Sequence, residues 1–242
     1  QPNIRFQQTK TMPHEVTRTD SAQVKYKRDE KTGYYKPAVD QKAGKKKSWN
    51  IARLSSRENP LVIFTLASQA AAGAFALLFF GKLFNIAALA PVIASPVSAL
   101  IVMTAIALIA LGLFMSTIHL GKPMRFYRGF NNLRHSPVSR EGLGIVLFMQ
   151  FAGLHFLAAL PGNAWVQEYV GVLNAEWQNI ASLVANGTAG LAVISSAVAL
   201  YYMYRCYRIK ARPFWDHKQT AFTFTGTTLN LGSAVVGIFA VP

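Results

Sequence analysis

The sequence has little cysteine, few acidic residues, and long stretches with no charge at all. Cys206 is the single cysteine among 242 residues. This excludes an internal disulfide and any iron–sulfur cluster held by several cysteines of this chain. Lys and Arg number 25, against only 10 Asp and Glu. A positive excess of this size would suggest nucleic-acid binding if it formed one patch on a soluble fold, so its distribution along the chain decides the matter.

Five stretches contain no Asp, Glu, Lys or Arg: 61–80, 97–118, 142–160, 180–204 and 220–241. Each is close in length to the roughly 20 apolar residues that cross a bilayer core as a helix. They are apolar on every side, which fits lipid-facing helices better than the alternative, buried helices of a large soluble protein. The sequence therefore predicts an all-α fold, a polytopic membrane helix bundle with five transmembrane helices and an extended N-terminal tail.

The charges sort by loop. Residues 1–60 carry 14 Lys and Arg against 6 Asp and Glu, and the connections after the second and fourth spans each hold five Lys or Arg. The other two connections hold only Lys82, Glu168 and Glu176. Because cytoplasmic loops carry the excess of Lys and Arg, we expect a multi-pass protein with its N-terminal tail in the cytoplasm. The basic balance is then a matter of topology, and no nucleic-acid partner is expected.

The chain divides by composition into two parts. Residues 1–59 show neither a helical nor a strand period, and their polar composition does not bury a core. We expect a basic extended tail or linker over 1–59, lying near lipid headgroups or on a partner. A transmembrane anchor domain follows over 60–242. The chain does not begin with Met and stops at the end of a span, so we expect a segment of a longer polypeptide with a truncated anchor domain.

Two ionisable residues flank the basic loop between the second and third spans. His119 ends the second span and Glu141 opens the third, 22 residues later. Each alone could simply complement a helix dipole. A helix hairpin, however, brings both to the same membrane edge, where an ionisable residue is a candidate for function. Quinol oxidation releases two electrons and two protons, and a facing histidine and carboxylate can accept those protons. We therefore predict His119 and Glu141 as the catalytic pair.

Arg125 and Arg140 lie in the same loop. They could hold Glu141 ionised, steer a quinone oxygen or dock an acidic partner, or they could serve topology alone. We include both with His119 and Glu141 as candidate quinol-binding residues and expect no metal site. His155 lies 14 residues beyond Glu141, about 21 Å along a helix, so it cannot share one haem with His119. His155 is predicted to be a helix-packing residue.

Residues 119–124 read His-Leu-Gly-Lys-Pro-Met, and Glu141 follows 22 residues after His119. In this the protein resembles the anchor subunit family (DmsC) of DMSO-reductase-type molybdoenzymes. Weaker matches support the resemblance at 58–64, 131–133, 139–141, 212–215 and 229–232. The similarity extends over about residues 55–242. Residues 1–13 are similar to the C-terminal tail of a ferredoxin-like electron-transfer subunit.

The resemblance implies that the protein is the quinol-oxidising membrane subunit of a prokaryotic inner (cytoplasmic) membrane oxidoreductase. His119 and Glu141 would bind menaquinol, and its electrons would pass to a ferredoxin-like iron–sulfur subunit, fused upstream of this segment. A molybdopterin catalytic subunit would carry out substrate chemistry, so molybdopterin and iron–sulfur clusters would sit only in the partners. The alternatives are a structural membrane anchor without a quinol site and a secondary transporter, although the sequence shows no internal repeat typical of transporters.

Overall fold

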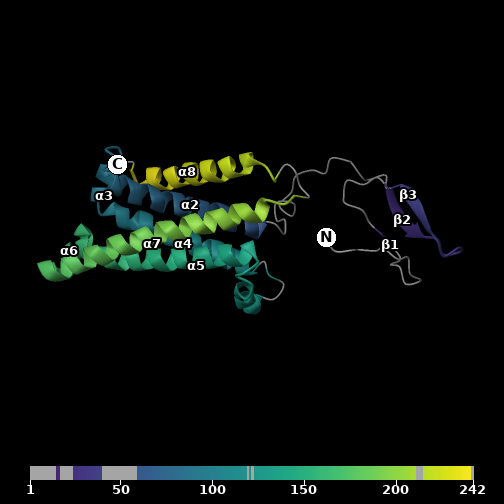
Figure 1. The fold of residues 1–242 in the computed structure, drawn as a ribbon, viewed down its shortest axis with the longest axis horizontal. Coiled ribbons are helices and arrows are strands. Elements are labelled where there is room, and N and C mark those ends of the chain that lie inside the picture. Colours follow the sequence, from purple (N-terminus) through teal and green to yellow (C-terminus); the bar gives the residue numbers. More distant parts are fainter. Residues whose placement is uncertain are drawn as a thin grey trace. The chain divides into compact units, whose positions relative to one another are not determined.

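The computed structural model describes residues 15–16, 24–39, 59–118, 120, 123–210 and 215–240. The protein forms two compact units, Gln1–Ser55 and Ser56–Pro242 (Figure 1).

The first unit contains a small antiparallel sheet. Its strands are β1 (Glu15–Val16), β2 (Val24–Arg28) and β3 (Tyr35–Val39), in that spatial order. A tight turn joins β2 to β3: the carboxylate of Asp29 accepts from the backbone N–H of Lys31 at 2.9 Å, and Gly33 has a φ of +72°. A glycine adopts this left-handed conformation at little cost. The predicted extended tail therefore includes a sheet that its composition did not indicate, because the alternation in β2 is too short to stand out.

The second unit is built on five long helices. They are α2 (Asn59–Leu83), α4 (Val97–Ile118), α5 (Pro137–Ala159), α7 (Ala175–Tyr207) and α8 (Lys218–Ala240). Each is long and apolar enough to cross a membrane. The helix α7 is the longest, with 33 residues. The predicted helix bundle with five spans is confirmed.

Short elements mark the two ends of this bundle. The 3-10 helix η1 (Pro123–Phe130) lies in the connection between α4 and α5. At the opposite end are α3 (Ala90–Ala94), the 3-10 turn η2 (Leu160–Gly162) and α6 (Ala164–Val170) (Figure 1). We call the end with η1 and the Lys/Arg-rich connections the basic end, and the end with α3 and α6 the far end.

Side-chain caps fix where several helices begin. Ser136 Oγ accepts from the N–H of Ser139 at 3.3 Å, and Pro137 then starts α5. Asn174 Oδ1 accepts from the N–H of Trp177 at 2.9 Å and starts α7. Such caps satisfy backbone donors that have no partner within the helix.

The central helix is α2. Over its most apolar 18 residues α2 is 61% buried, whereas α8 is only 11% buried and is the least buried of the five long helices. Glycines allow these two backbones to touch: a Cβ added to Gly73 would lie 2.0 Å from the carbonyl oxygen of Thr228, and one on Gly232 would lie 2.3 Å from the carbonyl carbon of Gly73. Small residues permit this close packing between membrane helices.

The helices α5 and α7 form an antiparallel pair along most of the length of α5. Near the basic end, a Cβ on Gly144 would lie 2.9 Å from the Cα of Ala199. Towards the far end, the imidazole of His155 reaches the carbonyl oxygen of Ala185. This pair therefore positions polar side chains at both ends of the bundle.

Candidate functional site

Glu141 is a buried acid at the basic end. It is the fifth residue of α5, and its side chain is only 8% exposed. The thiol of Cys206, in the last turn of α7, donates to Glu141 Oε2 at 3.3 Å. Because burying a carboxyl group without a partner is costly, this contact helps to hold the side chain against α7. A thiol is a weak donor, so the carboxyl keeps most of its hydrogen-bonding capacity for a ligand.

Cys206 was not among the predicted site residues. It lies 65 positions from Glu141, and only the antiparallel register of α5 and α7 brings the two together. The sequence does indicate that the two residues lie at the ends of two spans on the same side of the membrane, Glu141 at a start and Cys206 at a finish. It does not indicate which residue of α7 faces Glu141.

His119 falls outside the described residues. It follows Ile118, the last residue of α4, and α4 contacts α5 within the bundle. The pairing of His119 with Glu141 stays a prediction.

Arg140 holds the connection before α5 in place. Its guanidinium donates to the carbonyl oxygens of Leu133 at 2.7 Å and Arg134 at 2.5 Å, and to the hydroxyl of Tyr202 at 3.2 Å. It also lies over the Tyr202 ring, 5.2 Å from the centroid. Among the contacts of the described residues, the Arg140 side chain therefore binds the loop and α7 and makes no ion pair with Glu141. Its part in quinol binding stays a prediction.

Arg125 belongs to a cationic surface on the basic end, which we call the basic rim. Its members are exposed Lys and Arg side chains of η1, the η1–α5 connection, the end of α7 and the start of α8: Arg125, Arg128, Arg134, Arg205, Arg208, Lys210 and Lys218. Apolar side chains stand among them, since Met124 is 87% and Phe126 52% exposed. A hydrogen bond to Asp216 raises the pKa of the Arg208 guanidinium further, so this cation stays charged.

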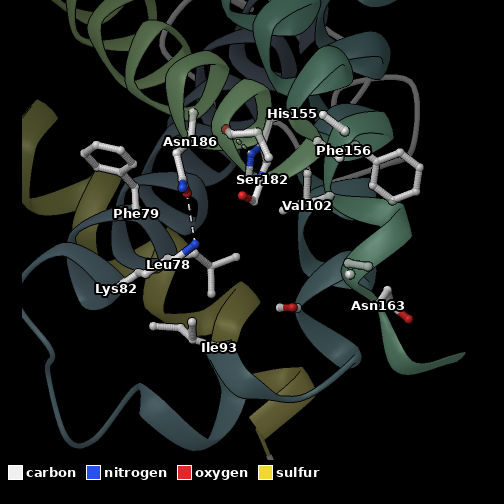
Figure 2. A pocket seen from close by; sticks show the side chains of 18 of the residues that line it. Leu78, Phe79, Lys82, Ile93, Val102, His155, Phe156, Asn163, Ser182 and Asn186 are labelled. Carbon is white, nitrogen blue, oxygen red and sulfur yellow. Dashed lines mark hydrogen bonds between the residues drawn. The ribbon is translucent and has the colours of Figure 1, made fainter. Parts of the chain in front are cut away.

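Two cavities lie at the far end, away from Glu141. The larger, of about 890 Å³, is bordered by α2, α3, α4, α5 and α7 (Figure 2). The smaller, of about 320 Å³, lies between α4, α5 and α6. His155 and Lys82 line the larger cavity, which we call the far-end cavity. The sequence pattern gave no sign of it, because a cavity depends on how side chains fill space rather than on which residues are polar.

Five membrane-length helices, with a buried acid and a cationic surface at one end, define an integral membrane protein. The model of the DMSO reductase anchor subunit family (DmsC) matches residues 54–241, and the protein belongs to this family. The predicted resemblance is confirmed.

A curated relative agrees with this assignment. Over 185 residues, the sequence is 26% identical to a chain of the anaerobic dimethyl sulfoxide reductase of Haemophilus influenzae, in an alignment that includes 76% of the present sequence. The present sequence spans about three-fifths (59%) of the length of that relative. No solved structure matches the present sequence.

Proposed function

We propose that this membrane anchor binds menaquinol at the basic end and passes its electrons to an iron–sulfur partner subunit. The observation that carries the proposal is Glu141, a carboxyl group buried at a helix–helix contact at the edge of the membrane span. Acidic residues within membrane spans are rare and are usually functional. Glu141 lies beside the connection between α4 and α5. The family adds the expectation that the end of α4 supplies His119.

The proposed reaction has a simple balance. Both O–H bonds of the quinol break, two electrons leave for the iron–sulfur subunit, and two protons pass to acceptors of this protein. Glu141 is one acceptor and His119 is the other, and both then release the protons to water. Positioned acid–base groups of this kind contribute about 10²–10⁴-fold to a rate. The anchor supplies the quinol's binding, orientation and proton acceptors, while the clusters belong to the partner.

The basic rim is the proposed docking surface for that partner. Its exposed cations steer an acidic surface, and the apolar side chains of η1 add area that loses water on contact. Arg140, which fixes the loop to α7, would keep η1 in a defined place for docking. By the loop charges the basic rim lies in the cytoplasm of a prokaryotic cell. Labelling of single cysteines placed at position 128 and, separately, at position 168 with a membrane-impermeant maleimide, in a Cys206→Ser background, tests that side.

The function is tested by replacing Glu141 with Gln, which keeps the shape of the side chain but cannot accept a proton. Membranes that contain the complete complex receive a menaquinol analogue, and reduction of the iron–sulfur clusters is followed by electron paramagnetic resonance. We expect the rate to fall by about 100-fold or more in Glu141→Gln, and similarly in His119→Ala.

The matched control is Glu168→Gln, which changes an exposed acid of α6 at the far end. It should leave the rate unchanged. Activity driven by a reduced viologen dye, which bypasses the quinol, should persist in every variant and so shows that the complex has assembled. Wild-type quinol-driven rates in Glu141→Gln would instead identify a structural anchor without a site at this position.

A further inference from the structure

The far-end cavity combines aromatic walls with a small polar cluster, and the function proposed above uses neither. Phe75 and Phe79 of α2 and Phe156 of α5 line it. Figure 2 shows Phe79 and Phe156 on opposite sides of the polar side chains. At about 890 Å³, the space falls in the range of sites for small molecules, which are mostly apolar with a few placed polar groups.

The first polar group is an ammonium. Lys82, in the last turn of α2, donates from Nζ to Asn186 Oδ1 of α7 at 3.0 Å (Figure 2). An ammonium has three donor protons, so two are left for other acceptors. The contact with α7 holds this flexible side chain at the wall of the cavity instead of leaving it free in water.

The second polar group is an imidazole. His155 Nδ1 lies 2.8 Å from the carbonyl oxygen of Ala185, and a carbonyl can only accept, so Nδ1 carries the proton. In the neutral ring, Nε2 is then an acceptor available to a ligand. The ring of Phe75 packs edge-on against the imidazole at a centroid distance of 5.4 Å and restricts its rotation.

The donor and the acceptor are placed together by α7. Lys82 contacts Asn186, and His155 contacts the residue directly before it, Ala185. Consecutive residues of a helix differ by only about 1.5 Å in height, so the two polar groups are held at nearly the same level in the bundle. A ligand that reaches both needs an acceptor atom for the Lys82 ammonium and a donor for Nε2 of His155.

The charge of this end favours a neutral ligand. Lys82 is the one permanently charged side chain among the described residues that line the cavity. Glu168 of α6 and Glu176 in the first turn of α7 lie at the same end. A phosphate is normally held by several cations or N–H groups, and this end offers one cation with acids nearby. A flat, uncharged ring between aromatic walls fits better.

We propose that the far-end cavity is a second binding site for a lipid-borne quinone ring, separate from the site at Glu141. In the oxidised ring a carbonyl oxygen accepts from Lys82. In the reduced ring one hydroxyl oxygen accepts from Lys82 and the other hydroxyl donates to Nε2 of His155. The ring lies between Phe79 and Phe156. The proposal concerns binding alone and does not depend on the function proposed for the basic end.

The test uses the complex in lipid nanodiscs of phosphatidylcholine and an azido-naphthoquinone with a short isoprenoid tail. After illumination, the labelled peptides are identified by mass spectrometry. We expect label on the segments 75–82, 155–163 and 178–189. In Lys82→Met, label on these segments should fall about tenfold, since a hydrogen bond to a charged group is lost. Lys82→Arg keeps a cationic donor and should retain most of the label.

His155→Leu should weaken competition by unlabelled menadiol, the reduced ring whose hydroxyl donates to Nε2, and a melting curve of each variant shows whether it has folded. Lys82 is exposed, so Lys82→Met decides the question even if His155→Leu fails to fold. Glu141→Gln should leave the far-end label intact, which separates this site from the basic end. The proposal is overturned by an absence of label on these segments in the wild type, or by equal label in Lys82→Met. Competition by phosphatidylglycerol, but not by unlabelled menadione, would also overturn it and identify a lipid site.

Discussion

The two ends of the bundle treat polar groups in opposite ways. At the basic end an acid is buried against α7 while the cations around it stand in water. At the far end a cation and an imidazole border a hollow, and the acids lie outside it. The same antiparallel pair, α5 and α7, contributes to both arrangements.

Small residues explain the difference, because they act in two ways. Near the basic end, Gly144 lets α5 approach Ala199 so closely that an added Cβ would clash, and the space between the helices is closed. At the far end, Ala99 of α4 and Ala181 and Ala185 of α7 border the cavity instead. The lesson is that a small residue seals a helix contact only where the backbones meet, and otherwise leaves volume for a ligand.

The largest effect is expected from Gly73→Ala, which should destabilise the whole bundle and so disrupt the basic end and the far end together. The added Cβ would lie 2.0 Å from the carbonyl oxygen of Thr228, which belongs to backbone and cannot move aside cheaply. Overpacking of this kind costs about 3 kcal/mol of unfolding free energy. We expect a lower melting temperature, with loss of quinol-driven electron transfer and of far-end labelling.

The matched control is Gly237→Ala on α8, where an added Cβ meets no atom within 4 Å. This variant should melt at or slightly above the wild-type temperature, since alanine favours a helix by about 1 kcal/mol over glycine. Equal melting temperatures for Gly73→Ala and the wild type would mean that α2 and α8 do not touch here.

A smaller effect, confined to the basic end, is expected from Cys206→Ala. It removes the donor to Glu141 Oε2, and a hydrogen bond of this kind is worth about 1 kcal/mol. If Glu141 accepts protons from the quinol, quinol-driven reduction of the clusters should fall about fivefold, while far-end labelling is unchanged. Cys206→Ser keeps a donor at this position and should restore the rate. A Cys206→Ala rate equal to the wild type would show that the thiol does not position Glu141.

The smallest effect is expected at the far end, from Asn163→Ala. Asn163 Nδ2 donates to the carbonyl oxygen of Pro96 at 3.0 Å, and its Oδ1 caps α6 by accepting from the N–H of Trp165. Loss of the cap costs about 1 kcal/mol, so the amides of α6 should exchange hydrogen several times faster. Asn163→Asp keeps the cap acceptor and should restore slow exchange. Faster exchange in both variants would assign the effect to the Pro96 contact instead.

The spans were predictable because they follow from local composition. The uncharged run 97–118 coincides with α4. The other four runs lie inside their helices or extend one residue past the last helical residue. The position of Glu141 at the end of a span was predictable for a similar reason, as an acid next to an apolar run. The three-stranded sheet was not, because it rests on one turn at Asp29–Gly33 and on strands of at most five residues.

The partners of the polar residues could not be predicted from the sequence. Cys206 meets Glu141, and Lys82 meets Asn186, across separations of 65 and 104 residues. Both contacts depend on the rotation and register of packed helices, which an apolar run does not specify. His155 was predicted to pack against another helix, and its bond to Ala185 agrees with that.

The length of α7 has a mechanical consequence. A helix of 33 residues is about 50 Å long, whereas the hydrocarbon core of a bilayer is about 30 Å thick. It therefore projects into the aqueous layers, with Trp177 near one tip and Arg205 near the other. Hydrophobic mismatch makes a helix tilt more in a thinner bilayer, and a rigid rod turns that tilt into opposite displacements of its two tips. A change in the acyl length of the lipids would therefore move the parts of α7 at both membrane surfaces at once.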